Sequence, residues 1–259
     1  MTINFKGDEL KINLIDEGTG DVVVFLHGWG ANAAIYRSII NLLTPHYRVI
    51  APDFPGFGES DEPSFAYDAK DYADFVLVLL KQLNITKASF IGHSHGGRTV
   101  IEIASRDENE IEIEIDKIVL MDSAGIRAKL SLSKKMRVRV FKLLKKIVMI
   151  KPIRKAYPDA LDKLKRKFGS ADYSYASEIM RQSFVKVVNS DYKERLHKIS
   201  VPTLLLWGEK DTATPLSDAE YMKSKIKDSG LVTVKNGGHF CFTEDFGLVA
   251  RVLASFFNF

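Results

Sequence analysis

A serine set between glycines is the residue with the clearest chemical potential in this chain. Ser94 lies in the run Gly92-His93-Ser94-His95-Gly96-Gly97, between the short apolar segment 88–91 and the helical-looking stretch 98–105. On a sharp strand–turn–helix connection, neighbours without Cβ atoms let the strand and the helix pass close to the serine. The N–H groups that open the helix point to where negative charge develops in acyl transfer. The pattern therefore predicts Ser94 as a nucleophile.

A serine hydroxyl needs a base to remove its proton, and a histidine is the usual choice. His239 follows the strand-like run 231–234 through the loop Asn236-Gly237-Gly238. This placement puts its imidazole on a turn at the carboxyl end of a strand, within reach of a serine. The other histidines lie in surface-type contexts or in other parts of the same site. We therefore predict His239 as the base.

A carboxylate is expected behind the histidine, to fix its tautomer and to stabilise the imidazolium ion. Asp211 lies a few residues beyond the apolar run Leu204-Leu205-Leu206-Trp207, and the chain order serine, aspartate, histidine favours it. Asp122, after the run 118–121, is the alternative acid. The single cysteine, Cys241, follows His239 by two residues but lacks the glycine-flanked turn of Ser94, so we do not expect it to be the nucleophile.

Backbone N–H groups are expected to hold the oxyanion. The turn His27-Gly28-Trp29-Gly30 directly follows the apolar run 22–26 and exposes its main-chain donors. We predict the oxyanion hole to consist of the N–H of Trp29 and the N–H of His95, the residue after the nucleophile. The Trp29 side chain is expected to form part of a pocket wall.

Strand-like and helix-like segments alternate along the chain, and every reactive block follows a strand-like segment. Such alternation predicts an α/β fold with a doubly wound, mostly parallel sheet and sites at the carboxyl ends of its strands. We expect a hairpin at 2–6 and 9–15, further strands at 21–26, 47–51, 88–93, 115–121, 202–207 and 230–235, and helices at 33–43, 69–83, 96–105, 216–227 and 245–257.

These blocks resemble the α/β-hydrolase fold superfamily, in its lid-bearing branch of serine hydrolases. The resemblance covers nearly the whole chain, and its motifs stand in the family's order: 27–30, Asp53-Phe54-Pro55-Gly56-Phe57-Gly58, the serine turn, Trp207-Gly208-Glu209-Lys210-Asp211 and Gly238-His239. It implies a hydrolase that needs no cofactor and no metal. Relatives that carry aspartate as nucleophile include dehalogenases and epoxide hydrolases, and Ser94 argues against both activities. Many relatives have methionine where this chain has His95.

The alternation is interrupted between about residues 125 and 198, and the interruption is strongly basic. It holds 21 Lys and Arg residues against 6 Asp and Glu residues, whereas the remainder holds 16 against 27. By position it resembles the helical lid of these hydrolases, which predicts a core of 1–124 and 199–259 with an inserted cap at 125–198. Residues 134–148 combine apolar spacing typical of a helix with basic residues. The basic surface is either a solvated face, an attractor of anionic ligands, or a contact with anionic lipid. Nucleic acid binding is not expected.

Length and composition agree with one soluble domain. The chain has 259 residues, of which 46% are hydrophobic and 27% charged, as in ordinary globular proteins. The first residues lack the build of a signal peptide and a single cysteine fits a reducing compartment, so we expect a cytoplasmic protein. Three functions stay open: hydrolysis of ester-like bonds in small or medium apolar substrates, hydrolysis of a carbon–carbon bond in diketone-type acids, or ligand sensing. The substrate and the oligomeric state are left open.

Overall fold

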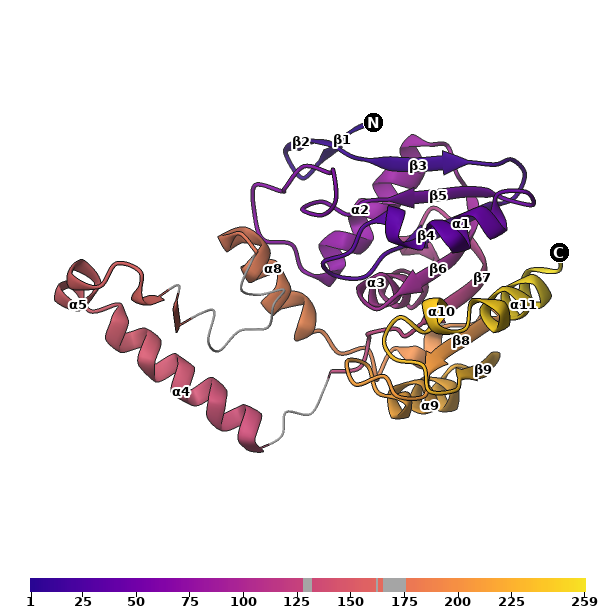
Figure 1. Cartoon of the computed structure of the whole chain (residues 1–259). Coiled ribbons are helices and arrows are strands. Elements are labelled where there is room, and N and C mark those ends of the chain that lie inside the picture. Colours follow the sequence, from indigo (N-terminus) through magenta and orange to yellow (C-terminus); the bar gives the residue numbers. More distant parts are fainter. Residues whose placement is uncertain (128–131, 162, 165–175) are drawn as a thin grey trace.

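The computed structural model describes residues 1–127, 132–161, 163–164 and 176–259, and Figure 1 shows a central sheet with helices on both faces. Within the described residues, seven strands form this sheet in the order β3-β5-β4-β6-β7-β8-β9. All neighbouring strands run parallel except β3 and β5, which are antiparallel. The predicted fold class, α/β with a doubly wound and mostly parallel sheet, is confirmed.

The elements of the sheet and its covering helices have the following bounds. The strands are β3 (Leu14–Glu17), β4 (Val22–Leu26), β5 (Arg48–Pro52), β6 (Lys87–His93), β7 (Glu114–Met121), β8 (Thr203–Gly208) and β9 (Ser229–Val234). The helices are α1 (Arg37–Leu43), α2 (Ala69–Gln82), α3 (His95–Ala104), α9 (Leu216–Lys225), α10 (Cys241–Glu244) and α11 (Phe246–Phe257), with short 3₁₀ turns η1 (Ala33–Tyr36), η2 (Glu108–Glu110) and η3 (Leu196–Lys198).

The central strands read as unbroken apolar runs because both faces of the sheet are covered. In β4, Val24 and Leu26 pack in the core under α2, α3 and α9, whereas Val23 and Phe25 pack in the core under α1 and α11. Successive side chains of a strand point to opposite faces, so one short run supplies both cores. This two-sided burial fixes the strand ends from which the reactive loops project.

The amino-terminal segment differs from the expected hairpin. Strands β1 (Thr2–Phe5) and β2 (Asp8–Lys11) do form an antiparallel pair, but they make a separate two-stranded sheet. The chain leaves that pair at Asn13, whose N–H and side chain bond to Ser60 and Asp53, and β3 then joins the main sheet beside β5. The predicted strand 9–15 was therefore wrong, because side-chain partners far along the chain bend it between two sheets.

Between β7 and β8, the described residues include the helices α4 (Leu132–Val148), α5 (Lys151–Ala156) and α8 (Glu178–Val188). We call the main sheet and its covering helices the α/β body. Helix α8 is bound to this body, since the Arg98 guanidinium donates to the Val187 carbonyl and the Ser183 hydroxyl accepts from the Tyr67 N–H. Figure 1 shows α4 and α5 standing apart from the sheet and its helices. The helix expected at 134–148 is present, while the boundaries of an inserted cap at 125 and 198 stay a prediction.

Candidate active site

Ser94 occupies the turn between β6 and α3 in a strained backbone conformation. Its φ is 51° and its ψ is −111°, a combination that residues with a side chain rarely adopt. The flanking glycines make the turn possible: a Cβ on Gly92 would lie 2.6 Å from Gly97 Cα, and one on Gly96 would collide with the Leu26 carbonyl. The chain thus holds the serine hydroxyl at the carboxyl end of β6, in the centre of the sheet.

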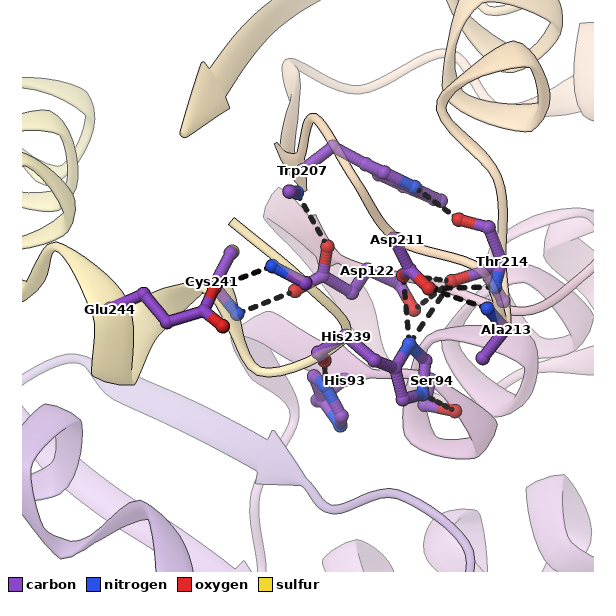
Figure 2. A network of polar contacts seen from close by, with 12 residues as sticks. His93, Ser94, Asp122, Trp207, Asp211, Ala213, Thr214, His239, Cys241 and Glu244 are labelled. Atoms are coloured by element: carbon purple, nitrogen blue, oxygen red, sulfur yellow. Dashed lines mark hydrogen bonds and ion pairs between the residues drawn. The ribbon is translucent and has the colours of Figure 1, made fainter. Parts of the chain in front are cut away.

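The three residues predicted to act together are in contact (Figure 2). His239 Nε2 lies 3.0 Å from Ser94 Oγ, and His239 Nδ1 lies 2.8 Å from Asp211 Oδ2. The carboxylate accepts a hydrogen bond from the Nδ1–H group, so the proton of the neutral ring lies on Nδ1 and Nε2 is free to accept from the serine hydroxyl. Ser94 comes from the end of β6, Asp211 from the loop after β8, and His239 from the loop after β9. Three loops at one edge of the sheet therefore build the arrangement.

The Asp211 carboxylate is buried and bonded at both oxygens. Oδ1 accepts from the N–H groups of Ala213 and Thr214, and Oδ2 accepts from the Thr214 hydroxyl at 2.7 Å as well as from His239. Burial alone would raise the pKa of Asp211, but the hydrogen bonds from His239 and Thr214 outweigh it and hold that pKa below its ordinary value. The carboxylate is therefore ionised and fixed in place.

Thr214 is a site residue that the sequence reasoning missed. Besides bonding Asp211, its hydroxyl lies 2.9 Å from the Asp122 carbonyl and 3.3 Å from His239 Nδ1, and its own carbonyl accepts from the Trp207 indole. The spacing Asp-x-x-Thr, typical of a polar turn in which the aspartate accepts from the next residues, could have indicated it.

Asp122, the alternative acid, lies at the same edge of the sheet but bonds other groups. Its carboxylate accepts from the Gly208 N–H at 2.7 Å and from the Cys241 N–H at 3.1 Å, and it is fully buried. Burial raises its pKa to about 6, against the opposing hydrogen bonds from Cys241 and Gly208. Asp122 therefore joins the end of β8 to the start of α10, and Asp211 is the acid that contacts His239.

The predicted oxyanion donors are the N–H group of His95, which follows the serine in the chain, and that of Trp29, whose neighbour Gly28 lies beside the serine. In the described part of the chain, neither the Trp29 N–H nor the His95 N–H donates to a protein acceptor. The loop after β4 passes close to the nucleophile, since a Cβ on Gly28 would lie 3.3 Å from Ser94 Cβ. Their joint role as an oxyanion hole stays a prediction that this geometry supports.

Aromatic side chains surround these donors. The Trp29 ring contacts those of Phe57, Tyr72 and His95, and it meets Phe184 of α8 at a centroid distance of 5.2 Å. The His95 imidazole is buried, and both of its nitrogens lack a hydrogen-bond partner among the described residues. Burial lowers the pKa of His95 well below its ordinary value, so the ring is neutral. The site is therefore flanked by an apolar cluster to which α8 contributes.

A buried chain of hydrogen bonds links the loop after β4 to the loop of His239. The Gly28 N–H donates to the Tyr36 hydroxyl, which donates to His93 Nδ1 at 2.7 Å, and His93 Nε2 donates to the His239 carbonyl at 2.7 Å. Burial and the neighbouring His239 lower the pKa of His93 to about 3, which keeps the ring neutral. This support for the base was not predicted, because Tyr36 and His93 are far apart in the sequence.

The remaining candidates have structural environments. His27 accepts from the Phe54 N–H and donates to the Gly28 carbonyl, which ties the loop after β4 to the loop after β5. The Cys241 thiol is buried next to Asp122, and both effects raise its pKa, so it is held protonated. Among the described residues, no group of three or more His, Cys, Asp or Glu side chains is arranged to hold a metal ion.

Comparison with known proteins gives a consistent result. A family model described as "alpha/beta hydrolase fold" matches residues 21–246. The chain is 29% identical to the AB hydrolase superfamily protein YisY of Bacillus subtilis, with 94% of each chain covered. It is 27% identical to a 2-hydroxy-6-oxo-6-phenylhexa-2,4-dienoate hydrolase of Burkholderia cepacia, covering 99% of this chain and 94% of the relative.

Among solved structures, the chain is similar to an esterase from Exiguobacterium antarcticum. The two share 26% sequence identity, the TM-score is 0.76, and 98% of each chain is covered.

In the described part of the chain, no helix combines the length and the apolar character needed to cross a membrane.

Proposed function

The chain belongs to the α/β-hydrolase fold family and is a hydrolase, and we propose that it is a serine hydrolase that cleaves ester-like bonds of small or medium apolar substrates. The observation that carries the proposal is the unbroken series of contacts from Ser94 Oγ through His239 to Asp211, at 3.0 and 2.8 Å. The similarity to an esterase over nearly the full length supports the same reaction class.

The proposed reaction has two steps, both served by the same histidine. His239 Nε2 takes the Ser94 proton as the oxygen attacks the carbonyl, and it then gives that proton to the departing alcohol. A water then attacks the acyl-enzyme while His239 takes a proton from it, and His239 gives that proton to the Ser94 oxygen as the acyl–oxygen bond breaks, which releases the acid and regenerates Ser94. Asp211, ionised by its hydrogen bonds, stabilises the imidazolium in both steps. The N–H groups of Trp29 and His95 hold the oxyanion.

The segment between β7 and β8 is proposed to act as the cap of this site. Contact between Phe184 of α8 and the Trp29 ring supports the idea, because it brings an apolar side chain of that segment next to a proposed oxyanion donor. A cap of this kind shapes the substrate pocket and excludes water. The aromatic cluster around Trp29 favours an apolar substrate. We further propose a cytoplasmic location, which the single, buried and protonated cysteine supports.

Hydrolysis of a carbon–carbon bond in a diketone-type acid is the second candidate. The curated relative from Burkholderia cepacia is named as a hydrolase of such an acid, and this chain matches 94% of its length. The same serine, histidine and oxyanion donors can serve this reaction. A ligand sensor that retains the three residues is a third candidate, which only the absence of turnover would favour.

Active-site labelling combined with turnover distinguishes these candidates. The chain and its Ser94→Ala variant are treated with a fluorophosphonate, and then both are assayed with acyl esters of increasing chain length and with one vinylogous diketo acid. We expect rapid labelling that depends on Ser94 and many turnovers of an ester. Preferred turnover of the diketo acid would select the second candidate, and labelling without turnover of any substrate would select the sensor. Turnover by Ser94→Ala at the wild-type rate would reject the proposed mechanism.

A further inference from the structure

Helix α4 exposes an apolar stripe that nothing in the described structure covers. Met136, Val140, Leu143 and Ile147 recur at helical spacing and so lie on one side of the helix, and their side chains are between 39% and 61% exposed. The half-buried residues Phe141, Leu144 and Val148 lie on the adjoining side. The exposed stripe continues beyond the helix into Met149 and Ile150, both of which are about half exposed. Contiguous exposed apolar side chains of this kind mark surfaces that bind a partner or a membrane.

The charges around the stripe have a single sign. Residues 132–158 contain ten Lys and Arg residues and no Asp or Glu. Arg139 and Lys146 border the stripe on one side, and Lys142 and Lys145 lie farther around the helix, all with exposed side chains. No acidic residue within this segment can neutralise them. Any occupant of the surface must therefore accept aliphatic side chains and offer negative charge along the same 17-residue helix, which is roughly 25 Å long.

We propose that α4, with the start of α5, binds the surface of an anionic phospholipid bilayer and lies in the plane of its interface. The aliphatic stripe enters the boundary between headgroups and acyl chains, while the lysine stems extend and place their ammonium groups among lipid phosphates. A bilayer surface satisfies both requirements at once. A nucleic acid would use the charge but leave the stripe exposed to water, so the apolar residues favour lipid.

Helix α8, which follows α4 and α5 in the chain, is docked on the rest of the molecule. Arg98, which is buried in α3, donates to the carbonyls of Val187 and Ser190 at the end of α8, and the Lys186 ammonium donates to the Ala66 carbonyl. Because α4 and α8 belong to one chain, binding through α4 would attach the docked molecule to the bilayer. The proposal does not depend on the proposed function, because it concerns a surface outside the site of Ser94.

The test measures partition of the intact chain onto sucrose-loaded vesicles, in the Ser94→Ala background so that no lipid is hydrolysed. We expect at least tenfold stronger binding to phosphatidylcholine vesicles containing about one third phosphatidylglycerol than to phosphatidylcholine alone, and loss of the difference in high salt. Lys142→Gln with Lys146→Gln should weaken binding about thirtyfold, since each basic residue near the surface contributes about 1 kcal/mol. Lys210→Gln with Lys223→Gln, two exposed lysines of the body, is the matched control and should change little.

A second pair of variants tests insertion of the stripe. Leu143→Ser with Ile147→Ser should weaken binding at least tenfold, whereas Ile35→Ser with Val185→Ser, at similarly exposed positions (48% and 46%), should not. Circular dichroism verifies that each variant is folded. Equal binding to both vesicle types, or unchanged binding of the Leu143 and Ile147 variant, overturns the proposal. Absence of vesicle binding, together with self-association that this variant abolishes, would instead assign the stripe to a second copy of the chain.

Discussion

The loops at the carboxyl ends of the strands and the helices α4 and α5 differ in how their side chains find partners. Around Ser94, several polar side chains are held by internal hydrogen bonds: Asp211 accepts four, and His93 is held between Tyr36 and His239. In α4, apolar and basic side chains are both exposed, and the helix stands apart from the body. Catalytic side chains are held in place by hydrogen bonds within the protein. A helix that binds an external surface must instead leave its apolar and charged side chains exposed to that surface.

This contrast predicts that substitutions in the two regions separate cleanly. Changes in the loops should affect the chemical step even with a soluble substrate in dilute buffer. Changes in α4 should affect what the molecule binds and leave the chemical step unaltered. The following experiments test that separation.

Loss of the nucleophile should have the largest effect. Ser94→Ala should leave folding intact and lower kcat for an activated ester by roughly 10⁴- to 10⁶-fold, because no other group occupies the strained turn. Steady-state assays with active-site titration measure it. Cys241→Ser is the control and should retain a rate close to that of the wild type, since its thiol is buried and protonated. A loss for Cys241→Ser as great as that for Ser94→Ala would transfer the nucleophilic role to the thiol.

Loss of the Asp211 carboxylate should have the second largest effect on kcat. Asp211→Asn should lower kcat by roughly 10⁴-fold with little change in KM, because the carboxylate acts on His239 and not on the substrate. Asp122→Asn should lower kcat by no more than about tenfold, since Asp122 bonds backbone groups of Gly208 and Cys241. The reverse order of severity would make Asp122 the acid of the site.

Asp122 also predicts a pH dependence of stability. Its folded pKa of about 6 lies above the ordinary value of 3.8, so the stability it contributes is complete below that value and is lost as the pH rises through 6. Two pKa units correspond to about 3 kcal/mol in the free energy of unfolding. Asp122→Asn does not titrate, so the free energy of unfolding of this variant minus that of the wild type should increase by about that amount between pH 4 and 7. Urea unfolding measures the difference, and parallel pH profiles for the two proteins would contradict it.

The sequence indicated the parts of the site that follow local rules. The glycines around Ser94, the strand before Asp211 and the turn before His239 each have a short-range pattern, and their order along the chain linked them. The structure brings these three residues into contact. The main strands were equally accessible, because buried parallel strands are continuous apolar runs.

What the sequence did not predict depends on contacts between distant residues. Tyr36 and His93 are 57 positions apart and meet only because the sheet brings the segment after β4 and the end of β6 together. The bend at Asn13 depends in the same way on Asp53 and Ser60. The charge of the segment 125–198 was evident from composition, but whether its apolar residues are covered was not, because helical spacing does not say what a helix packs against.

Breaking the chain of hydrogen bonds through His93 should lower kcat moderately. His93→Phe keeps an aromatic ring beside Phe240 and Phe242 but leaves the Tyr36 hydroxyl and the His239 carbonyl without their partner. We expect kcat to fall roughly ten- to hundredfold with KM little changed, as expected from the 1–3 kcal/mol cost of an unpaired buried group. His93→Gln, which retains a donor for the carbonyl, should recover part of the loss. Equal rates for both variants and the wild type would show that the hydrogen bonds of His93 do not position the base.

The smallest effect concerns the charge of α4 and a dissolved anionic substrate. If that charge draws small anions to the site, kcat/KM for a carboxylate-bearing ester should fall about two- to threefold as salt rises, and a neutral ester of the same size should not respond. The effect should be small because α4 stands apart from the body, and exposed charges are screened over about 8–10 Å near physiological ionic strength. Lys142→Glu, Lys145→Glu and Lys146→Glu together should flatten the salt response without changing kcat for the neutral ester. Equal salt responses of the two esters would limit the charge of α4 to contacts away from the site, and a lower kcat for the neutral ester would contradict the separation of the two regions.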